Sequence, residues 1–210
     1  MSPVKIGVLI SGGGTNLQAI IDNIKNKNIN GEIKLIISNK EDAYGLVRGA
    51  IAGIETLYIN PKNYSSSEDY NLGLINELSK RKIELVVLAG YLKVLSKNFI
   101  ESFSNRIINI HPSLIPSFCG KEFYGIRVHE EVLKYGVKYT GVTVHFVDEG
   151  TDTGPIILQK IVEVDRNDTV DTLQKKVLEK EHDAIVEAIK LYCENRITIK
   201  GRHVIISEVD

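Results

Sequence analysis

The centre of the chain reads Arg106-Ile107-Ile108-Asn109-Ile110-His111-Pro112-Ser113-Leu114-Ile115-Pro116. Pro112 has no amide hydrogen to donate within a central strand, so the apolar run before it predicts a strand that ends at His111. Asn109 and His111 then share one face at the carboxyl end of that strand, the edge where open α/β sheets bind ligands. An amide donor beside an imidazole can stabilise negative charge on a carbonyl oxygen. The alternative is that both side chains only bind loop backbone.

A glycine turn follows the first apolar run of the chain. Val4–Ile10 is predicted to be a strand buried on both faces, and it leads through Ser11-Gly12-Gly13-Gly14-Thr15-Asn16 into a helix. Free amides and the positive end of the helix dipole favour an anion in such a turn. Leu17 stands where a dinucleotide fingerprint needs glycine, and the Gly-Lys-Ser/Thr of a P-loop is absent. The turn therefore predicts a site for a single phosphate, or is only a tight turn.

Strands and helices alternate regularly before residue 106. Apolar runs predict strands, and helical spacing predicts helices, at 32–38, 43–52, 55–59, 84–90 and 96–104. A capping box from Ser65 to Glu68 predicts the start of a further helix. This alternation predicts an α/β fold with a doubly wound, mostly parallel sheet. Gly90 falls on the expected ligand edge, and Leu92 to Leu95 behind it is either plain packing or the wall of a flat apolar pocket.

The pattern changes after Pro116. Residues 117–127 carry glycines and aromatics without a period, which predicts a loop. The elements expected after it are a short helix, an antiparallel strand pair, a long helix and a small hairpin, at 128–135, 140–148 with 155–162, 169–195 and 197–206.

Two acidic residues of this part have open interpretations. Asp152 lies in the turn between the antiparallel strands, where aspartate is a common turn residue. Glu181 falls on the apolar stripe of the long helix, for which Asp168 is the expected N-cap. A carboxylate on that stripe needs a partner, because burying it alone is costly. The partner is either the hydroxyls of a bound sugar or a protein cation.

Composition excludes several classes of protein. The 210 residues are 43% hydrophobic and 25% charged with a formal net charge of −1, which gives no general attraction to nucleic acid or to a membrane surface. No apolar run approaches the roughly 20 residues that span a bilayer. Cys119 and Cys193 stand alone and the first residues lack signal-peptide features, so a cytoplasmic protein is expected. No metal site is expected, since no Cys-x-x-Cys or His-Glu-x-x-His occurs.

Four stretches together carry a resemblance. They are Ser11-Gly12-Gly13-Gly14-Thr15-Asn16-Leu17, Val87-Leu88-Ala89-Gly90-Tyr91, Asn109-Ile110-His111-Pro112-Ser113-Leu114-Ile115-Pro116 and the segment from Gly141 to Pro155. In this order they resemble the phosphoribosylglycinamide formyltransferases, folate-dependent enzymes of purine biosynthesis, over nearly the whole chain. The resemblance implies one domain with the Rossmann-like formyltransferase fold. Residues 1–100 would be its phosphate-binding half, 101–195 its catalytic and folate-binding half, and 196–210 a C-terminal hairpin.

The resemblance also implies roles for individual residues. Asn109, His111 and Asp152 match the catalytic amide, imidazole and carboxylate. The substrate-binding positions are Gly14, Thr15 and Asn16 for the phosphate, Glu181 for the ribose hydroxyls and Gly90 for the glycinamide. The positions around the folate ring are Leu92, Lys93, Val94, Leu95, Asn109, Asp148, Glu149 and Gly150. The co-substrate would be 10-formyltetrahydrofolate, and Asp152 is expected to raise the pKa of His111 so that its charged form is favoured.

Some positions depart from the family pattern or receive no role. Ser67 and Lys93 stand where an arginine is familiar, which affects contacts to the folate tail, and the loop at 119–127 is longer than in some members. His145 is expected near the site in a supporting or structural position, while His129 and His182 receive no role.

Two other functions remain as alternatives. One is an enzyme that hydrolyses formyltetrahydrofolate or formylates a different amine, although the extra domains of such enzymes are expected to have no room in this chain. The other is a non-catalytic module that binds a phosphosugar. Partners would be these small molecules, in a monomer or homodimer.

Overall fold

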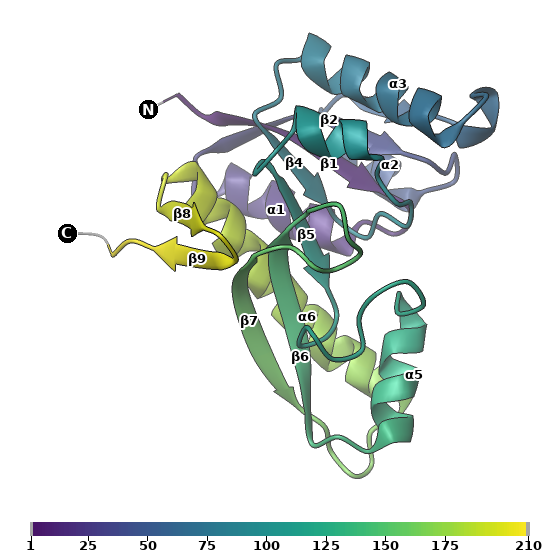
Figure 1. Ribbon diagram of the computed structural model, residues 1–210, viewed down its shortest axis with the longest axis vertical. Coiled ribbons are helices and arrows are strands. Elements are labelled where there is room, and N and C mark those ends of the chain that lie inside the picture. The colour runs from purple at the N-terminus through teal and green to yellow at the C-terminus, as the bar shows by residue number, and fades with distance from the viewer. Residues whose placement is uncertain (1, 209–210) are drawn as a thin grey trace. The chain divides into compact units, whose positions relative to one another are not determined.

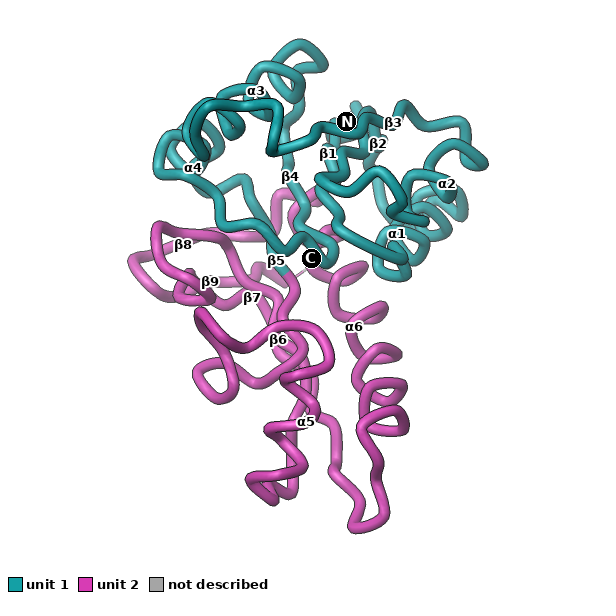
Figure 2. Tube along the Cα trace, turned by 90° about the vertical axis from the view of Figure 1, so that its right-hand side faces the viewer, with its two compact units in different colours: residues 1–109 teal, residues 110–210 magenta. Residues whose placement is uncertain are grey.

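A computed structural model describes residues 2–208, which form six α-helices, one short 3-10 helix and nine β-strands (Figure 1). The chain divides into two compact units, residues 1–109 and 110–210, shown in teal and magenta in Figure 2. The division falls inside strand β5 (Ile107–His111). Each unit therefore receives one of the two polar residues of that strand.

The first unit is built on a parallel sheet. Its strand order is β3-β2-β1-β4-β5, with every neighbouring pair parallel, and the first four strands in chain order are β1 (Val4–Ile10), β2 (Gly31–Ser38), β3 (Thr56–Tyr58) and β4 (Leu85–Leu88). All four residues of β4 are buried, as expected for a central strand that is covered on both faces. The carboxyl ends of β1 and β4 therefore lie at one edge of this sheet, and Asn109 of β5 pairs with Leu88 there.

Helices connect these strands. They are α1 (Thr15–Lys25), α2 (Tyr44–Ile51), η1 (Pro61–Asn63), α3 (Ser67–Lys80) and α4 (Lys97–Ser102). The predicted capping box at Ser65 is wrong by one residue, because the N-cap of α3 is Ser66, whose hydroxyl accepts a hydrogen bond from the amide of Asp69 at 3.0 Å. Ser65 instead donates its hydroxyl to the Asp69 carboxylate.

The second unit combines antiparallel strands with a long helix. Its elements are α5 (Ile126–Tyr135), β6 (Tyr139–Phe146), β7 (Ile156–Glu163), α6 (Val170–Cys193), β8 (Ile197–Lys200) and β9 (His203–Ile206). The pairs β6–β7 and β8–β9 are antiparallel, and β9 adjoins β7 at a single position. Helix α6 packs along β6 and β7 and also contacts α5 (Figure 1).

Capping of α6 differs from the expectation by one residue. The N-cap is Thr169, which forms a capping box with Thr172, whereas Asp168 accepts hydrogen bonds from the Asp165 amide and the Thr172 hydroxyl. The predicted fold class is confirmed: an α/β fold with a mostly parallel sheet, antiparallel C-terminal strands and a long C-terminal helix. Among the described residues, no helix is both long and apolar enough to cross a membrane.

Candidate active site

The glycine turn after β1 packs directly on the start of α2. Gly14 has left-handed backbone angles, φ 69° and ψ 36°, and a Cβ built on it would lie 2.7 Å from the Cα of Gly45. Any other residue at position 14 would be strained by its backbone angles and by this backbone contact. Thr15 and Asn16 open α1, and the first amides of an α-helix have no partner within the helix itself. The geometry is that of a helix-terminal anion site.

Ser11 joins this turn to the loop after β4. Its amide donates to the carbonyl of Gly90 at 3.1 Å, and its hydroxyl accepts a hydrogen bond from the amide of Leu92 at 2.9 Å. The same hydroxyl donates to the Asn39 side-chain oxygen at 2.6 Å. The predicted phosphate turn and the predicted folate wall are therefore hydrogen-bonded to each other within the first unit. Ser11 was part of the predicted phosphate turn, but its hydrogen bonds to the loop after β4 were not predicted from the sequence.

The loop that follows Gly90 exposes apolar side chains. Leu92 and Val94 are 52% and 75% exposed, whereas Leu95 is buried and Lys93 is exposed. Gly90 has φ 75°, which turns the chain out of the strand end. Exposed apolar side chains next to a polar turn are suited to the face of a flat ring.

The second unit brings His111 and Asp152 together. They are 41 positions apart in sequence, yet Asp152 Oδ2 lies 3.5 Å from His111 Nδ1, a distance for an ion pair rather than a short hydrogen bond. Asp152 has φ 58°, a left-handed conformation that aspartate tolerates in turns. Its other oxygen lies 3.7 Å from Nε2 of His145, whose Nδ1 is 2.8 Å from the Phe146 carbonyl. His145 therefore supports the carboxylate, as expected from its position in the sequence.

Asn109 and His111 are carried by the same strand. Both belong to β5, where Asn109 is half-buried and His111 is only 4% exposed. Side chains two residues apart on a strand point to the same face. The strand therefore carries an amide and an imidazole on one face, and the imidazole contacts the Asp152 carboxylate within the second unit.

Burial decides the pKa of the imidazole. It lowers the pKa of His111 below its usual value, and the raising effects of the Asp152 carboxylate and of the Phe118 carbonyl offset only part of this. Asp152 raises the pKa of His111 as expected, but burial outweighs this effect, so the charged form of His111 is not the favoured one. Burial raises the pKa of Asp152, but the contacts with His145 and His111 and the hydrogen bond from the Gly120 amide together outweigh it, so that pKa is below its usual value. Asp152 is an anion at neutral pH.

Backbone groups of the loop after Pro116 contact both members of the pair. The Phe118 carbonyl lies 2.9 Å from His111 Nε2, and the Gly120 amide donates to Asp152 Oδ2 at 2.9 Å. A carbonyl only accepts hydrogen bonds, so His111 carries its hydrogen on Nε2 in this arrangement. Main-chain hydrogen bonds do not depend on the identity of the side chain, so they are difficult to predict from a sequence. The one local signal here is Gly120, whose φ of 94° favours glycine.

The remaining predicted positions lie on the turn after β6 and on α6. Asp148 Oδ1 accepts hydrogen bonds from the Gly150 amide at 3.1 Å and the Thr153 hydroxyl at 2.5 Å, while Glu149 and Gly150 are exposed. Glu181 is half-buried on α6.

Two further histidines of this unit are shielded from solvent. His129 on α5 is buried, and burial together with the neighbouring His111 lowers its pKa to about 4. His182, next to Glu181 on α6, is half-buried and its pKa is also lowered by burial. Neither histidine is protonated to a large extent at neutral pH.

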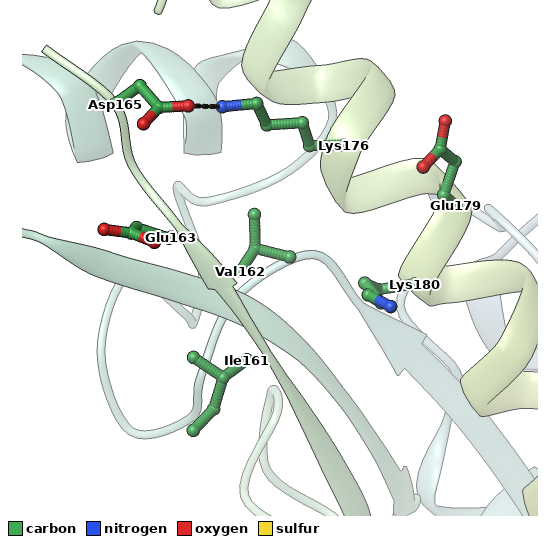
Figure 3. A pocket seen from close by; sticks show the side chains of 7 residues that line it. All are labelled: Ile161, Val162, Glu163, Asp165, Lys176, Glu179 and Lys180. Carbon is green, nitrogen blue, oxygen red and sulfur yellow. Dashed lines mark hydrogen bonds and ion pairs between the residues drawn. The ribbon is translucent and has the colours of Figure 1, made fainter.

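A shallow depression of about 270 Å³ lies elsewhere in the second unit (Figure 3). Its walls come from the end of β7, the segment after it and α6, and an ion pair between Lys176 and Asp165 stands at its side. Lys176 also bonds Asp168 at 2.9 Å. None of the predicted site residues lines it, so it is not a candidate for the site.

The parallel sheet, the antiparallel strand pair and the long last helix agree with the comparison with known families. The pattern that defines the Formyl transferase family matches residues 4–189, so this chain belongs to that family. The resemblance seen in the sequence is thereby confirmed.

Individual relatives carry more specific names. The chain is 40% identical over 194 residues to the chloroplastic phosphoribosylglycinamide formyltransferase of Arabidopsis thaliana, which covers 92% of this chain and 66% of that protein. It is 40% identical over 195 residues to the trifunctional purine biosynthetic protein adenosine-3 of Homo sapiens, covering 93% of this chain and 19% of that one. The chain thus spans just under two thirds of the first protein's length and about a fifth of the second's.

A solved structure is similar over almost the full length. The crystal structure of glycinamide ribonucleotide transformylase 1 from Symbiobacterium toebii superimposes with a TM-score of 0.94 and 43% sequence identity. The match covers 99% of this chain and 95% of that chain.

Proposed function

We propose that this chain transfers the formyl group of 10-formyltetrahydrofolate to the amine of glycinamide ribonucleotide, yielding formylglycinamide ribonucleotide and tetrahydrofolate in purine biosynthesis. The observation that carries the proposal is the pair of His111 and Asp152, 3.5 Å apart, with Asn109 on the same strand as the histidine. Membership of the formyl transferase family and the names of relatives at about 40% identity support the choice of reaction.

The transition state of formyl transfer requires stabilisation of negative charge on the formyl oxygen. As the amine attacks the formyl carbon, an electron pair of the carbonyl moves onto its oxygen. The side-chain amide of Asn109 and the Nε2–H of His111 donate to that oxygen, and one preorganised donor typically contributes about 3 kcal/mol to the transition state. The Asp152 carboxylate faces Nδ1 and stabilises the positive charge that His111 acquires when this nitrogen takes up a proton.

Protons and the leaving group complete the reaction. The carbon–nitrogen bond to the folate breaks and its electron pair returns to the folate nitrogen. One proton leaves the attacking amine and one reaches that nitrogen, with a water molecule beside Asp152 as the carrier. We assign no nucleophilic side chain and no metal ion to this sequence.

The loop after Pro116 must release its hydrogen bond to His111 when the substrate binds. Nε2 of His111 is 2.9 Å from the Phe118 carbonyl, so this hydrogen bond is exchanged for one to the formyl oxygen when substrate binds. The exchange replaces one carbonyl acceptor by another and therefore costs little in hydrogen bonding.

Binding roles follow the two halves of the chain. In residues 1–100, Gly14 to Asn16 bind the substrate phosphate and the Gly90 backbone contacts the glycinamide. In residues 101–195, Glu181 binds the ribose hydroxyls and Asp148 to Gly150 contact the pteridine ring, a role that Leu92 to Leu95 of the first half share. Strands β8 and β9 form a hairpin near the end of the chain, and the reaction takes place in the cytoplasm.

One assay separates this proposal from its alternatives. Purified protein is supplied with 10-formyltetrahydrofolate in the presence and absence of glycinamide ribonucleotide, and tetrahydrofolate is measured. Release that requires the ribonucleotide supports formyl transfer. Release that ignores the ribonucleotide refutes it in favour of a hydrolase. Binding of the ribonucleotide without any release refutes it in favour of a phosphosugar-binding module.

A further inference from the structure

Helix α2 holds the glycine turn at three successive residues. The Gly45 amide donates to the Gly12 carbonyl at 3.1 Å, and Nε of Arg48 donates to the Gly13 carbonyl at 2.8 Å. At Gly14 the backbones meet so closely that a Cβ would lie 2.7 Å from the Cα of Gly45. The turn is therefore shaped by α2 as well as by the strand and helix that it joins.

These contacts decide where the amides of the turn point. A trans peptide is planar, with its N–H directed opposite to its C=O. Because the carbonyls of Gly12 and Gly13 are bonded to α2, the N–H groups of Gly13 and Gly14 are directed away from α2. Without the Arg48 bond, the peptide between these two glycines would be free to turn its carbonyl oxygen towards a bound anion, which would repel it.

Arg48 itself is fixed at a defined place beside the turn. Its Nη1 donates to the Gln18 side-chain oxygen at 3.1 Å, and its guanidinium carbon lies 5.0 Å from the centre of the Tyr44 ring. Gln18 is held in turn by a 2.9 Å hydrogen bond to Asp22. A half-buried guanidinium with three such contacts keeps both its orientation and its positive charge next to the turn.

We infer that Arg48 is a positioning residue for the phosphate of the ribonucleotide substrate. It orients the Gly13–Gly14 peptide so that the amide faces the phosphate, and it adds a positive charge near that group. This inference rests on the proposed function. Sequence reasoning gave Arg48 no role, because the residue lies far along the chain from the glycine turn.

The test compares two variants with a matched control. Arg48→Met removes the charge and the hydrogen bonds, and Arg48→Lys keeps the charge without the planar fork. Lys25→Met removes one positive charge from the far end of α1. For each protein, kcat and KM are measured with glycinamide ribonucleotide, with formyl folate and with the corresponding glycinamide nucleoside that lacks the phosphate. Thermal unfolding gives the melting temperature.

The inference predicts a loss confined to the phosphorylated substrate. In Arg48→Met the KM for glycinamide ribonucleotide rises about tenfold or more, while kcat and the KM for formyl folate stay within about threefold. The kcat/KM for the nucleoside is unchanged, so the preference for the phosphorylated substrate falls by the same factor. Arg48→Lys recovers part of the loss, and Lys25→Met behaves like the unaltered protein.

Other results overturn the inference. An unchanged KM for the ribonucleotide in Arg48→Met refutes it while leaving the proposed function intact. Equal losses with both substrates, together with a lower melting temperature, assign Arg48 to stability alone and also refute it. If the unaltered protein transfers no formyl group to the ribonucleotide, the proposed function fails and the inference fails with it.

Discussion

Replacing Asp152 with asparagine tests the central pair of the site. The substitution removes the charge but keeps an oxygen that can accept the hydrogen bond from Gly120. At the observed 3.5 Å, a carboxylate and an imidazolium attract each other by up to about 5 kcal/mol at an effective dielectric constant of about 20. Only part of this attraction acts on the transition state. We therefore expect kcat to fall by about 100-fold or more, within the range of about 10²–10⁴ that is typical of acid–base groups.

The pKa of His111 provides a second measurement on the same variant. Asp152 raises this pKa, so its neutralisation lowers the pKa of His111 further below the usual value. Titration of the histidine ring signals by NMR, on both proteins without ligand, measures the change. The melting temperature is expected to stay within a few degrees, since the isosteric side chain keeps the turn. A kcat within threefold of the unaltered protein, or an unmoved His111 pKa, would refute the assigned role.

Three further predictions concern the strand end, the glycine turn and acid stability. Asn109→Ala should lower kcat by about 10²–10³ without a loss of melting temperature, and a smaller loss in steady-state assays would remove Asn109 from the oxyanion site. Gly14→Ala should lower the free energy of unfolding in urea by at least about 1–2 kcal/mol, because of its left-handed backbone and the contact with Gly45, and an unchanged urea midpoint would contradict this. Burial holds the pKa of His129 at about 4 in the folded protein, so the unfolded chain takes up this proton first as pH falls below about 6.5. The native state should thereby lose on the order of 3 kcal/mol towards pH 4, and His129→Leu should flatten that part of the pH dependence in urea titrations.

The first residues of two helices could be predicted from the sequence only to within one residue. Both predicted N-caps, Ser65 and Asp168, are one residue away from the observed ones, Ser66 and Thr169. Each lies in a run of residues that can all cap a helix, so local preference does not choose among them. The choice depends on which helical register buries the apolar stripe, and that is a property of the packed protein.

The order of strands and helices, the strand that ends before Pro112 and the glycine turn at Gly14 could all be predicted from the amino-acid sequence. These features depend on local properties, namely the missing amide of proline, the conformational freedom of glycine and the period of apolar residues. Three other features depend on the packed protein: the 3.5 Å separation of His111 and Asp152, the net lowering of the His111 pKa, and the contact of Arg48 with the glycine turn. Distances across the fold and the balance of burial against charge depend on every neighbour at once, so no stretch of sequence contains them.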